Sequence, residues 1–444
     1  MAPTTTIRIA LAGLGLASAT FAAATPALAV TELQWWHAMT GANNDAVNRL
    51  ADEFNASQSD YKVVPTYKGN YGETLNAGIA AFRAGTAPHI MQVFEVGTAT
   101  MMAAKGAVKP VYQLMKDAGE PFDPQAYLPA ITGYYSTTKG EMLSFPFNSS
   151  SMVMWVNTDA LKAIGVTEPP KTWPELFAAA KKLTQNGFPN CGFSTTWVTW
   201  LNIEQLSAWH NVPVATKANG MDGLDTTLEI NGPVQVKHLG NLAEAQKDKS
   251  FDYSGRYDSG FGRFTAGECP IMFGSSGSYG NVKGAAKFAW TSAPMPYYPD
   301  VPGAPQNSII GGASLWVMGG KKPDEYKGVA KFFTFLSDTD RQAKLHQTTG
   351  YMPITKAAYE KSKADGFYEK NPALEVPIKE LTNKPPTENS RGLRLGNLPQ
   401  MRDMWAEEIE ATLAGKKTAK QALDEAATRG NAMLRQFEKQ AGGR

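Results

Sequence analysis

The stretch ELQWWHAMTGANNDAVNRLADEFNASQSDYKVVPTYK (Glu32 to Lys68) decides the fold class, because strand and helix patterns follow one another within it. Its two ends, residues 32–38 and 61–68, are short apolar runs that predict strands. Between these runs, apolar residues recur at the spacing of one buried helix face, namely Val47, Leu50, Ala51 and Phe54. The stretch therefore predicts a strand–helix–strand unit.

The same alternation continues along the chain. Leu75, Ile79 and Phe82 predict a second helix closed by Gly85, and residues 89–96 predict a third strand. Alternating strands and helices are typical of an α/β lobe with a mostly parallel sheet. Ligands of such sheets bind beyond the carboxyl ends of the strands. Tyr71 and Glu95, which lie in loops at this edge, are therefore predicted to converge on one site.

A second lobe is predicted to begin near residue 147. In KTWPEL, Thr172 and Glu175 have the spacing of a helix-capping box, which places Trp173 in the first turn, where it is poorly placed for core packing. CPIMFGSSGSYGN (269–281) predicts a strand that runs into a Gly/Ser turn. SIIGGASLWVMGG (308–320) predicts another strand, and residues 404–437 are largely helical. The whole chain is thus expected to form two α/β lobes.

Composition and the amino terminus limit the function. The 444 residues carry a formal net charge of only +2, which argues against nucleic-acid or membrane-surface partners. Residues 1–29 have the pattern of a secretory signal peptide cleaved after Ala29, and no cysteine follows the cut to carry a lipid anchor. The protein is therefore expected in the periplasm.

Only two cysteines are present, Cys191 and Cys269. In an oxidising compartment they are candidates for one disulfide, and two buried thiols are the alternative.

Enzyme signatures are mostly missing. The sequence has no HExxH motif and no GxxxxGK[ST] loop, and GSSGS does not match the GxSxG nucleophile elbow. Its five histidines lack metal-ligand spacing. We therefore predict no catalytic residue, no metal and no cofactor, although paired carboxylates of a hydrolase would leave no motif.

Several short segments instead resemble parts of an anion site. Three Gly/Ser segments, SSS (149–151), SSGS (275–278) and IGG (310–312), offer hydroxyls and approachable backbone N–H groups. RGLRLGNLPQMR carries Arg391, Arg394 and Arg402 with no carboxylate inside the segment. A guanidinium matches phosphate geometry. The segment is therefore predicted to supply the cationic part of an anion site.

The motifs YKGNY, FEVGTATMM, FPFNSSS, IIGGAS, TTGYMP and RLGNLPQMR together resemble the family of periplasmic sn-glycerol-3-phosphate-binding proteins of ABC importers. This family lies in the maltose-binding-like superfamily of extracellular solute-binding proteins (family 1). The resemblance runs from about Val30 to the C-terminus. It implies a type II periplasmic binding protein fold, in which hinge closure of two lobes traps the ligand. Carried over motif by motif, the implied ligand contacts are Tyr71, Glu95, Ser150, Trp173, Ser275, Gly312, Tyr351 and Arg402.

The resemblance also implies roles and partners. Arg402 is expected to neutralise a phosphate, whereas Arg391 and Arg394 are expected to be structural or lobe-bridging. Glu95 is expected to accept glycerol hydroxyls at the opposite end, and Trp173 to cover the ligand. The ligand is an organophosphate, either sn-glycerol 3-phosphate or a glycerophosphodiester such as glycerophosphocholine. The protein is expected to be a monomer that delivers this ligand to membrane permease subunits. The alternatives are an oligosaccharide-binding protein on the same fold and, less favoured, a secreted phosphodiester hydrolase. The expected lobes are 30–146 plus 297–340 and 147–296 plus 341–444.

Overall fold

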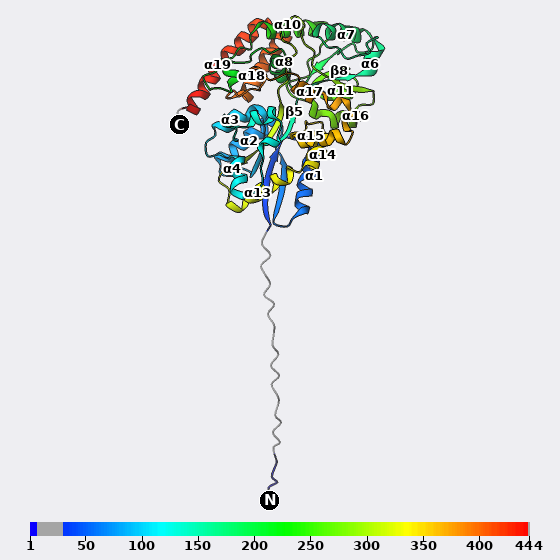
Figure 1. The fold of residues 1–444 in the computed structure, drawn as a ribbon. Helices are drawn as coiled ribbons and strands as arrows, with labels where there is room; N and C mark the ends of the chain where they lie inside the picture. The colour runs from blue at the N-terminus through cyan, green and yellow to red at the C-terminus, as the bar shows by residue number, and fades with distance from the viewer. Residues whose placement is uncertain (7–29, 443–444) are drawn as a thin grey trace.

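The computed structural model describes residues 1–6 and 30–442. The predicted signal peptide therefore lies largely outside the described residues. Figure 1 shows two lobes, the lower one around α1 to α4 and α13, and the upper one around α6, α7, α10, α18 and α19. No helix of the described residues has both the length and the apolarity needed to cross a bilayer.

The first lobe is built on a six-stranded sheet with the order β2-β1-β3-β10-β4, in which β5 also pairs with β10. Its strands are β1 (Thr31–His37), β2 (Tyr61–Tyr67), β3 (Ile90–Phe94), β4 (Val108–Lys109), β5 (Phe145–Ser150) and β10 (Gly311–Met318). Its helices are α1 (Gly41–Ser57), α2 (Tyr71–Arg83), α3 (Thr98–Ala103), α4 (Val111–Ala118), α5 (Pro129–Tyr135) and α13 (Pro323–Leu336).

The second lobe is built on a four-stranded sheet with the order β7-β8-β6-β9. Its strands are β6 (Met152–Asn157), β7 (Ser194–Thr195), β8 (Ile271–Ser275) and β9 (Trp290–Ala293). The helices that precede β9 along the chain are α6 (Thr158–Ala163), α7 (Trp173–Gln185), α8 (Leu206–Trp209), α9 (Thr216–Gly220), α10 (Pro233–Lys247), α11 (Phe261–Thr265) and α12 (Tyr279–Ala285). The helices after α13 are α14 (Thr339–Thr349), α15 (Lys356–Ala364), α16 (Phe367–Lys370), α17 (Val376–Leu381), α18 (Leu398–Leu413) and α19 (Ala419–Gly442).

The α/β class and the first strand–helix–strand unit are confirmed. The buried face of α1 is the predicted one, at Val47, Leu50, Ala51 and Phe54 with the addition of Ala46. In α2, however, Phe82 is exposed, because Leu75, Gly78 and Ala81 face the core instead. Gly78 leaves room there for the Met91 side chain of β3, since a Cβ would lie 1.9 Å from the Met91 sulfur.

In each lobe most of the described strands run in the same direction, as predicted, and one strand, β10 in the first sheet and β6 in the second, runs against the others. β1 pairs in parallel with β2 and β3, but β10 runs antiparallel to β3, β4 and β5. In the second sheet, β7 and β8 are parallel, whereas β6 is antiparallel to β8 and β9. The physical reason is the chain path: β10 enters the first sheet only after the chain has passed through the second lobe, and it comes in from the opposite direction.

The predicted disulfide between Cys191 and Cys269 is present, with the two Cα atoms 5.2 Å apart. Both residues are fully buried among Val153, Phe264 and Met272 of the second lobe. The bridge therefore belongs to the core of that lobe and lies away from the site described next.

Candidate functional site

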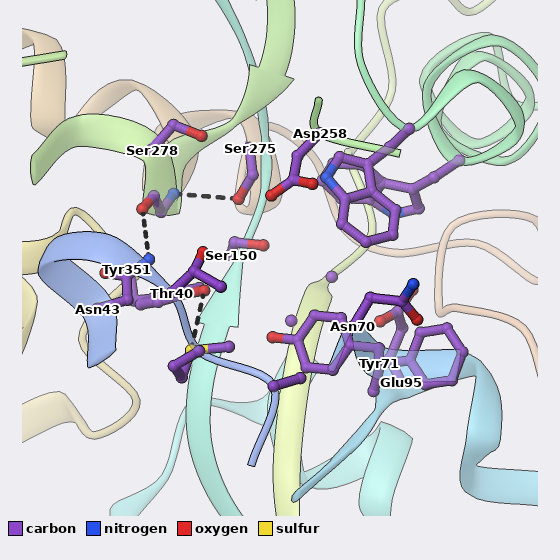
Figure 2. Close-up of a pocket in the computed structure, with 18 of the residues that line it drawn as sticks. Thr40, Asn43, Asn70, Tyr71, Glu95, Ser150, Asp258, Ser275, Ser278 and Tyr351 are labelled. Atoms are coloured by element: carbon purple, nitrogen blue, oxygen red, sulfur yellow. Dashed lines mark hydrogen bonds between the residues drawn. The ribbon is translucent and has the colours of Figure 1, made fainter. Parts of the chain in front are cut away.

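A cavity of about 160 Å³ lies between the lobes, and Figure 2 shows many of the residues that line it. Its wall contains all but one of the predicted contacts: Tyr71, Glu95, Ser150, Ser275, Gly312, Tyr351 and Arg402. They come from segments far apart in the sequence. Tyr71 is the first residue of α2, Glu95 follows β3, and Arg402 lies in α18. The predicted convergence at the carboxyl ends of the strands is thus observed.

Glycines let the backbone approach the cavity closely. Gly312 in β10 has φ +87°, and a Cβ there would collide with the Asn148 carbonyl oxygen. A Cβ on Gly277, in the turn after β8, would lie 2.5 Å from the ring of Tyr351. Both positions therefore require glycine, for conformation at Gly312 and for space at Gly277.

Two tyrosine hydroxyls meet in the cavity. Asn148 Nδ2 donates to the Tyr71 hydroxyl at 2.9 Å, and Asn148 Oδ1 accepts from Gln92 Nε2 at 2.8 Å. Burial raises the pKa of Tyr71 and of Tyr351 above their ordinary value. Both phenols therefore stay protonated at neutral pH and can donate hydrogen bonds to an anion.

Arg402 is held by two carboxylates that come from other elements. Its Nε and Nη2 donate to Glu204 Oε1 and Oε2 at 2.6 and 2.7 Å, and Nη2 also donates to Glu95 Oε1 at 2.6 Å. Burial disfavours the charged guanidinium, but Glu204 and Glu95 outweigh it and raise the pKa of Arg402. The expectation that Glu95 and Arg402 serve opposite ends of the ligand is therefore wrong, since the two side chains touch.

Glu204 was missed by sequence reasoning. It lies in a π-helical segment, Trp200–Gln205, that begins shortly after β7, and it is only 1 % exposed. Such segments are rare and occur often at functional sites. A π-helical geometry has no recognisable sequence pattern, so the sequence did not predict that Glu204 contacts Arg402.

The surroundings of Glu95 raise the pKa of its carboxyl. Burial raises the pKa of its carboxyl, Arg402 lowers it and Glu204 raises it, with a net result of about 6. Because the folded pKa lies above the ordinary value of 4.5, folding favours the protonated form.

We therefore expect Glu95 to stabilise the ligand-free protein fully only below about pH 4.5, and this contribution to be lost as the pH rises through about 6. The loss should amount to about 2 kcal/mol. It can be measured as the difference in free energy of unfolding between the wild type and Glu95→Gln from pH 4.5 to 7.5. As the pH rises, the free energy of unfolding of Glu95→Gln should increase relative to that of the wild type. If the free energies of unfolding of the two proteins change with pH in parallel, the raised pKa of Glu95 is contradicted.

Trp173 is the predicted contact that the structure does not bring to the cavity. Its side chain is 0 % exposed and packs against Phe273, Tyr298 and His238 in the core of the second lobe. The capping box at Thr172 and Glu175 is confirmed, but it turns the indole inward, so the expectation of poor core packing is wrong.

Two other tryptophans, Trp197 and Trp200, line the cavity instead. Trp197 has a φ of +44°, a conformation that non-glycine residues rarely adopt and that is often found at functional sites. Its ring lies 6.2 Å from that of Tyr71, so aromatic groups of the two lobes meet across the cavity.

Neither Arg391 nor Arg394 lines the cavity. Arg394 Nη2 donates to the carbonyls of Gly133, Tyr134 and Ser136 at 3.0–3.2 Å, at the end of α5. Its role is structural, as predicted.

Among residues 1–6 and 30–442, no group of three or more His, Cys, Asp or Glu side chains could hold a metal ion.

Two α/β lobes that enclose a small polar cavity between them define a solute-binding protein of the periplasmic type. The family model described as "Bacterial extracellular solute-binding protein" matches residues 49–376. The chain belongs to this family. It is 53% identical to the sn-glycerol-3-phosphate-binding periplasmic protein UgpB of Rhizobium meliloti (strain 1021), and the match covers 93% of this chain and 96% of the relative. UgpB of Brucella abortus (strain 2308) is 53% identical over 92% of this chain and 94% of its own.

Solved structures share the fold at lower identity. UgpB from Mycobacterium tuberculosis in complex with glycerophosphocholine has a TM-score of 0.78 at 18% identity, and covers 91% of this chain and 98% of its own. Maltose-bound MalE3 of T. maritima has a TM-score of 0.74 at 19% identity, and the match covers 91% of this chain and 100% of the MalE3 chain. At these identities the likeness extends to the fold only.

Proposed function

We propose that this protein captures sn-glycerol 3-phosphate and glycerophosphodiesters in the periplasm and delivers them to the permease of an ABC importer. It acts as a monomeric binding protein and transforms nothing. The observation that carries the proposal is the cavity itself, in which a charged cluster of Glu95, Arg402 and Glu204 meets a wall of hydroxyl groups. Relatives at 53% identity named as sn-glycerol-3-phosphate-binding proteins support it.

The charged cluster suits the glycerol end of the ligand. Arg402 Nη1 has no hydrogen-bond partner among the described residues, whereas Nε and Nη2 are engaged by carboxylates. A free guanidinium donor beside the Glu95 carboxylate offers one donor and one acceptor, which two neighbouring hydroxyls can satisfy. A phosphate in contact with the same cluster would face two carboxylates.

The phosphate is better placed at the opposite end. There the cavity wall carries the hydroxyls of Ser150, Ser275, Ser278 and Tyr351, as Figure 2 shows. The amino end of α1 also opens here: its N-cap Thr40 lines the cavity, makes no side-chain capping bond, and no acidic residue occupies the first turn. Helix amino termini and hydroxyl donors favour a phosphate.

The size of the cavity also selects the ligand. Pockets for drug-sized ligands span roughly 300–1,000 Å³. A cavity of about 160 Å³ fits a glycerophosphate much better than an oligosaccharide.

Capture follows from lobe closure. Asn43 Nδ2 in α1 donates to the Gly277 carbonyl after β8 at 3.1 Å, and Arg402 in α18 joins Glu95 after β3, so contacts between the lobes enclose the cavity. A ligand that touches both lobes binds the closed form better and shifts the population toward it. The chain crosses between the sheets at Ser151 and between β9 and β10, so β5 stays with the first lobe up to Ser150. Tyr298 packs in the core of the second lobe, so the proposed boundaries at 146 and 297 both move a few residues toward the C-terminus.

Calorimetry on ligand-stripped protein tests this function. We expect sn-glycerol 3-phosphate and glycerophosphocholine to bind, and maltose, glycerol and inorganic phosphate to bind far more weakly. Absence of heat with both phosphate esters would reject the proposal, and binding of maltose alone would favour the oligosaccharide alternative. Recovery of unchanged glycerophosphocholine after incubation tests the absence of hydrolysis.

A further inference from the structure

A second, larger pocket borders the segment that leads from β9 to β10. Its volume is about 700 Å³. Ile309 and Ile310 line this pocket, whereas the next two residues, Gly311 and Gly312, line the ligand cavity. One wall comes from the first lobe, around α5, and the facing wall comes from the second lobe, within residues 381–394. We call it the hinge pocket, because both lobes and the segment between them contribute to it.

Arg394 brings a positive charge to the hinge pocket that no carboxylate compensates. Its Nη2 donates to three carbonyl oxygens at the end of α5, but within residues 30–442 no acidic side chain contacts its guanidinium. Its Nε is buried without a hydrogen-bond partner, and its Nη1 donates to no described residue. Burial lowers the pKa of Arg394, so the charge is held there at a cost. An anion beside Nη1 would offset this cost and accept a charge-assisted hydrogen bond.

The other polar residues of the hinge pocket also favour an anion. Arg391 and Lys384 line it, and the one acidic residue of its described lining is Asp222, which is exposed and lies 4.0 Å from Arg391. The Ser136 hydroxyl makes no hydrogen bond with a described residue, although the Ser136 carbonyl accepts one from Arg394. The pocket therefore carries three cationic side chains against one carboxylate, together with a free hydroxyl donor.

Much of the remaining lining of the hinge pocket is apolar. It includes Leu128, Met221, Ile309, Ile310, Leu381 and Pro385. Sites for small organic ligands span roughly 300–1,000 Å³ and combine an apolar lining with a few placed polar groups. An inorganic ion would leave this apolar surface in contact with water. The lining therefore fits an organic anion whose charged head lies at Arg394 and whose apolar body covers the isoleucines.

The hinge pocket is connected to the ligand cavity through the π-helical segment. The Gln205 side chain bonds both backbone groups of Ile309, accepting from the N–H at 3.0 Å and donating to the carbonyl at 2.6 Å. The preceding residue, Glu204, holds Arg402 in the ligand cavity. A ligand that contacts both walls of the hinge pocket stabilises the lobe arrangement in which those walls meet, and the same arrangement encloses the ligand cavity.

We propose that the hinge pocket is a second ligand site, which binds a small organic anion with an apolar body and thereby strengthens ligand binding in the interlobe cavity. Arg394, Arg391 and Ser136 hold the anionic head. The strengthening rests on the proposed function, because it assumes that an organophosphate fills the interlobe cavity. Binding of the anion itself does not depend on that assumption.

Calorimetry with octanoate tests the site, on protein saturated with sn-glycerol 3-phosphate so that the interlobe cavity is filled. Acetate has the charge without the chain, and 1-octanol has the chain without the charge. Octanoate should bind at least tenfold more tightly than either, because it alone combines a charge-assisted hydrogen bond with burial of its methylene groups. In a separate titration, octanoate should tighten the binding of sn-glycerol 3-phosphate by about fivefold.

Arg391→Glu is the informative variant, because it reverses an exposed charge of the hinge pocket and leaves the carbonyl contacts of Arg394 in place. It should weaken octanoate at least tenfold, remove the effect of octanoate on sn-glycerol 3-phosphate, and leave the affinity for sn-glycerol 3-phosphate alone unchanged. The matched control is Arg83→Glu, since Arg83 is an exposed arginine of α2 that does not line the hinge pocket. This control should behave as the wild type in every titration.

Two results would overturn the site: no binding of octanoate, or equal binding of octanoate to wild type and Arg391→Glu. Octanoate that binds as expected but leaves the affinity for sn-glycerol 3-phosphate unchanged would overturn the coupling. If the protein binds no organophosphate, the proposed function fails, and octanoate titrated into the ligand-free protein still decides whether the hinge pocket is a site.

Discussion

Arg402→Ala should weaken binding of sn-glycerol 3-phosphate by about 2–4 kcal/mol, because a buried charged donor to the ligand is lost. The same change should lower the free energy of unfolding by about 3–5 kcal/mol. Arg402 is the group that neutralises Glu95 and Glu204, and without it two buried carboxylates face each other. Denaturant unfolding gives the second quantity, and calorimetry under conditions in which the variant remains folded gives the first.

Two further variants separate binding from stability. Arg402→Met combined with Glu204→Gln removes one carboxylate along with the guanidinium, so it should recover part of the stability and none of the binding. Arg429→Ala is the matched control, since Arg429 also bridges two glutamates, Glu407 and Glu408, but is 41% exposed and lies in α19. It should leave binding intact. If Arg402→Ala changes the binding free energy of sn-glycerol 3-phosphate by less than a few tenths of a kcal/mol, Arg402 does not contact the ligand.

Replacing both Cys191 and Cys269 with alanine should lower the free energy of unfolding by about 4 kcal/mol. The bridge closes a loop with a sequence separation of 78, and in the chain-entropy account its main effect is to restrict the unfolded chain. Ligand affinity should stay at the wild-type value, because neither cysteine lines the cavity.

Urea unfolding of the double alanine variant, with and without reductant, measures this effect. Reductant should lower the free energy of unfolding of the wild type to the value of the variant. It should leave the free energy of unfolding of the variant unchanged. A loss of stability below about 1 kcal/mol would show that the bridge restricts the unfolded chain far less than its loop length predicts.

The part of the fold that sequence could predict is the part set by local patterns. The face of α1, the capping box at Thr172 and the strands around Gly312 all follow from spacing within a few residues. The direction of β10 could not be predicted in this way, because it depends on where the chain re-enters the first sheet after more than a hundred residues in the second lobe.

In the site, too, local patterns could be predicted from the sequence and long-range contacts could not. Tyr71 and Glu95 could be predicted to converge, since both follow the topology of the first sheet. The partner of Arg402 could not, because Glu204 reaches it from a π-helical segment about 200 residues away in the chain. Trp173 and Trp197 both lie next to turns, and only tertiary packing decides that the first is buried in the core and the second faces the ligand cavity.

The central claim is that the ligand's phosphate lies among hydroxyls and the amino end of α1, and its glycerol hydroxyls on the Glu95–Arg402 pair. A crystal structure of the complex with sn-glycerol 3-phosphate tests it most directly. The account predicts phosphate oxygens within hydrogen-bond distance of Ser275 and Tyr351, and glycerol oxygens within that distance of Glu95 and Arg402. A phosphate bound directly to the Arg402 guanidinium, or a ligand bound outside this cavity, would contradict it.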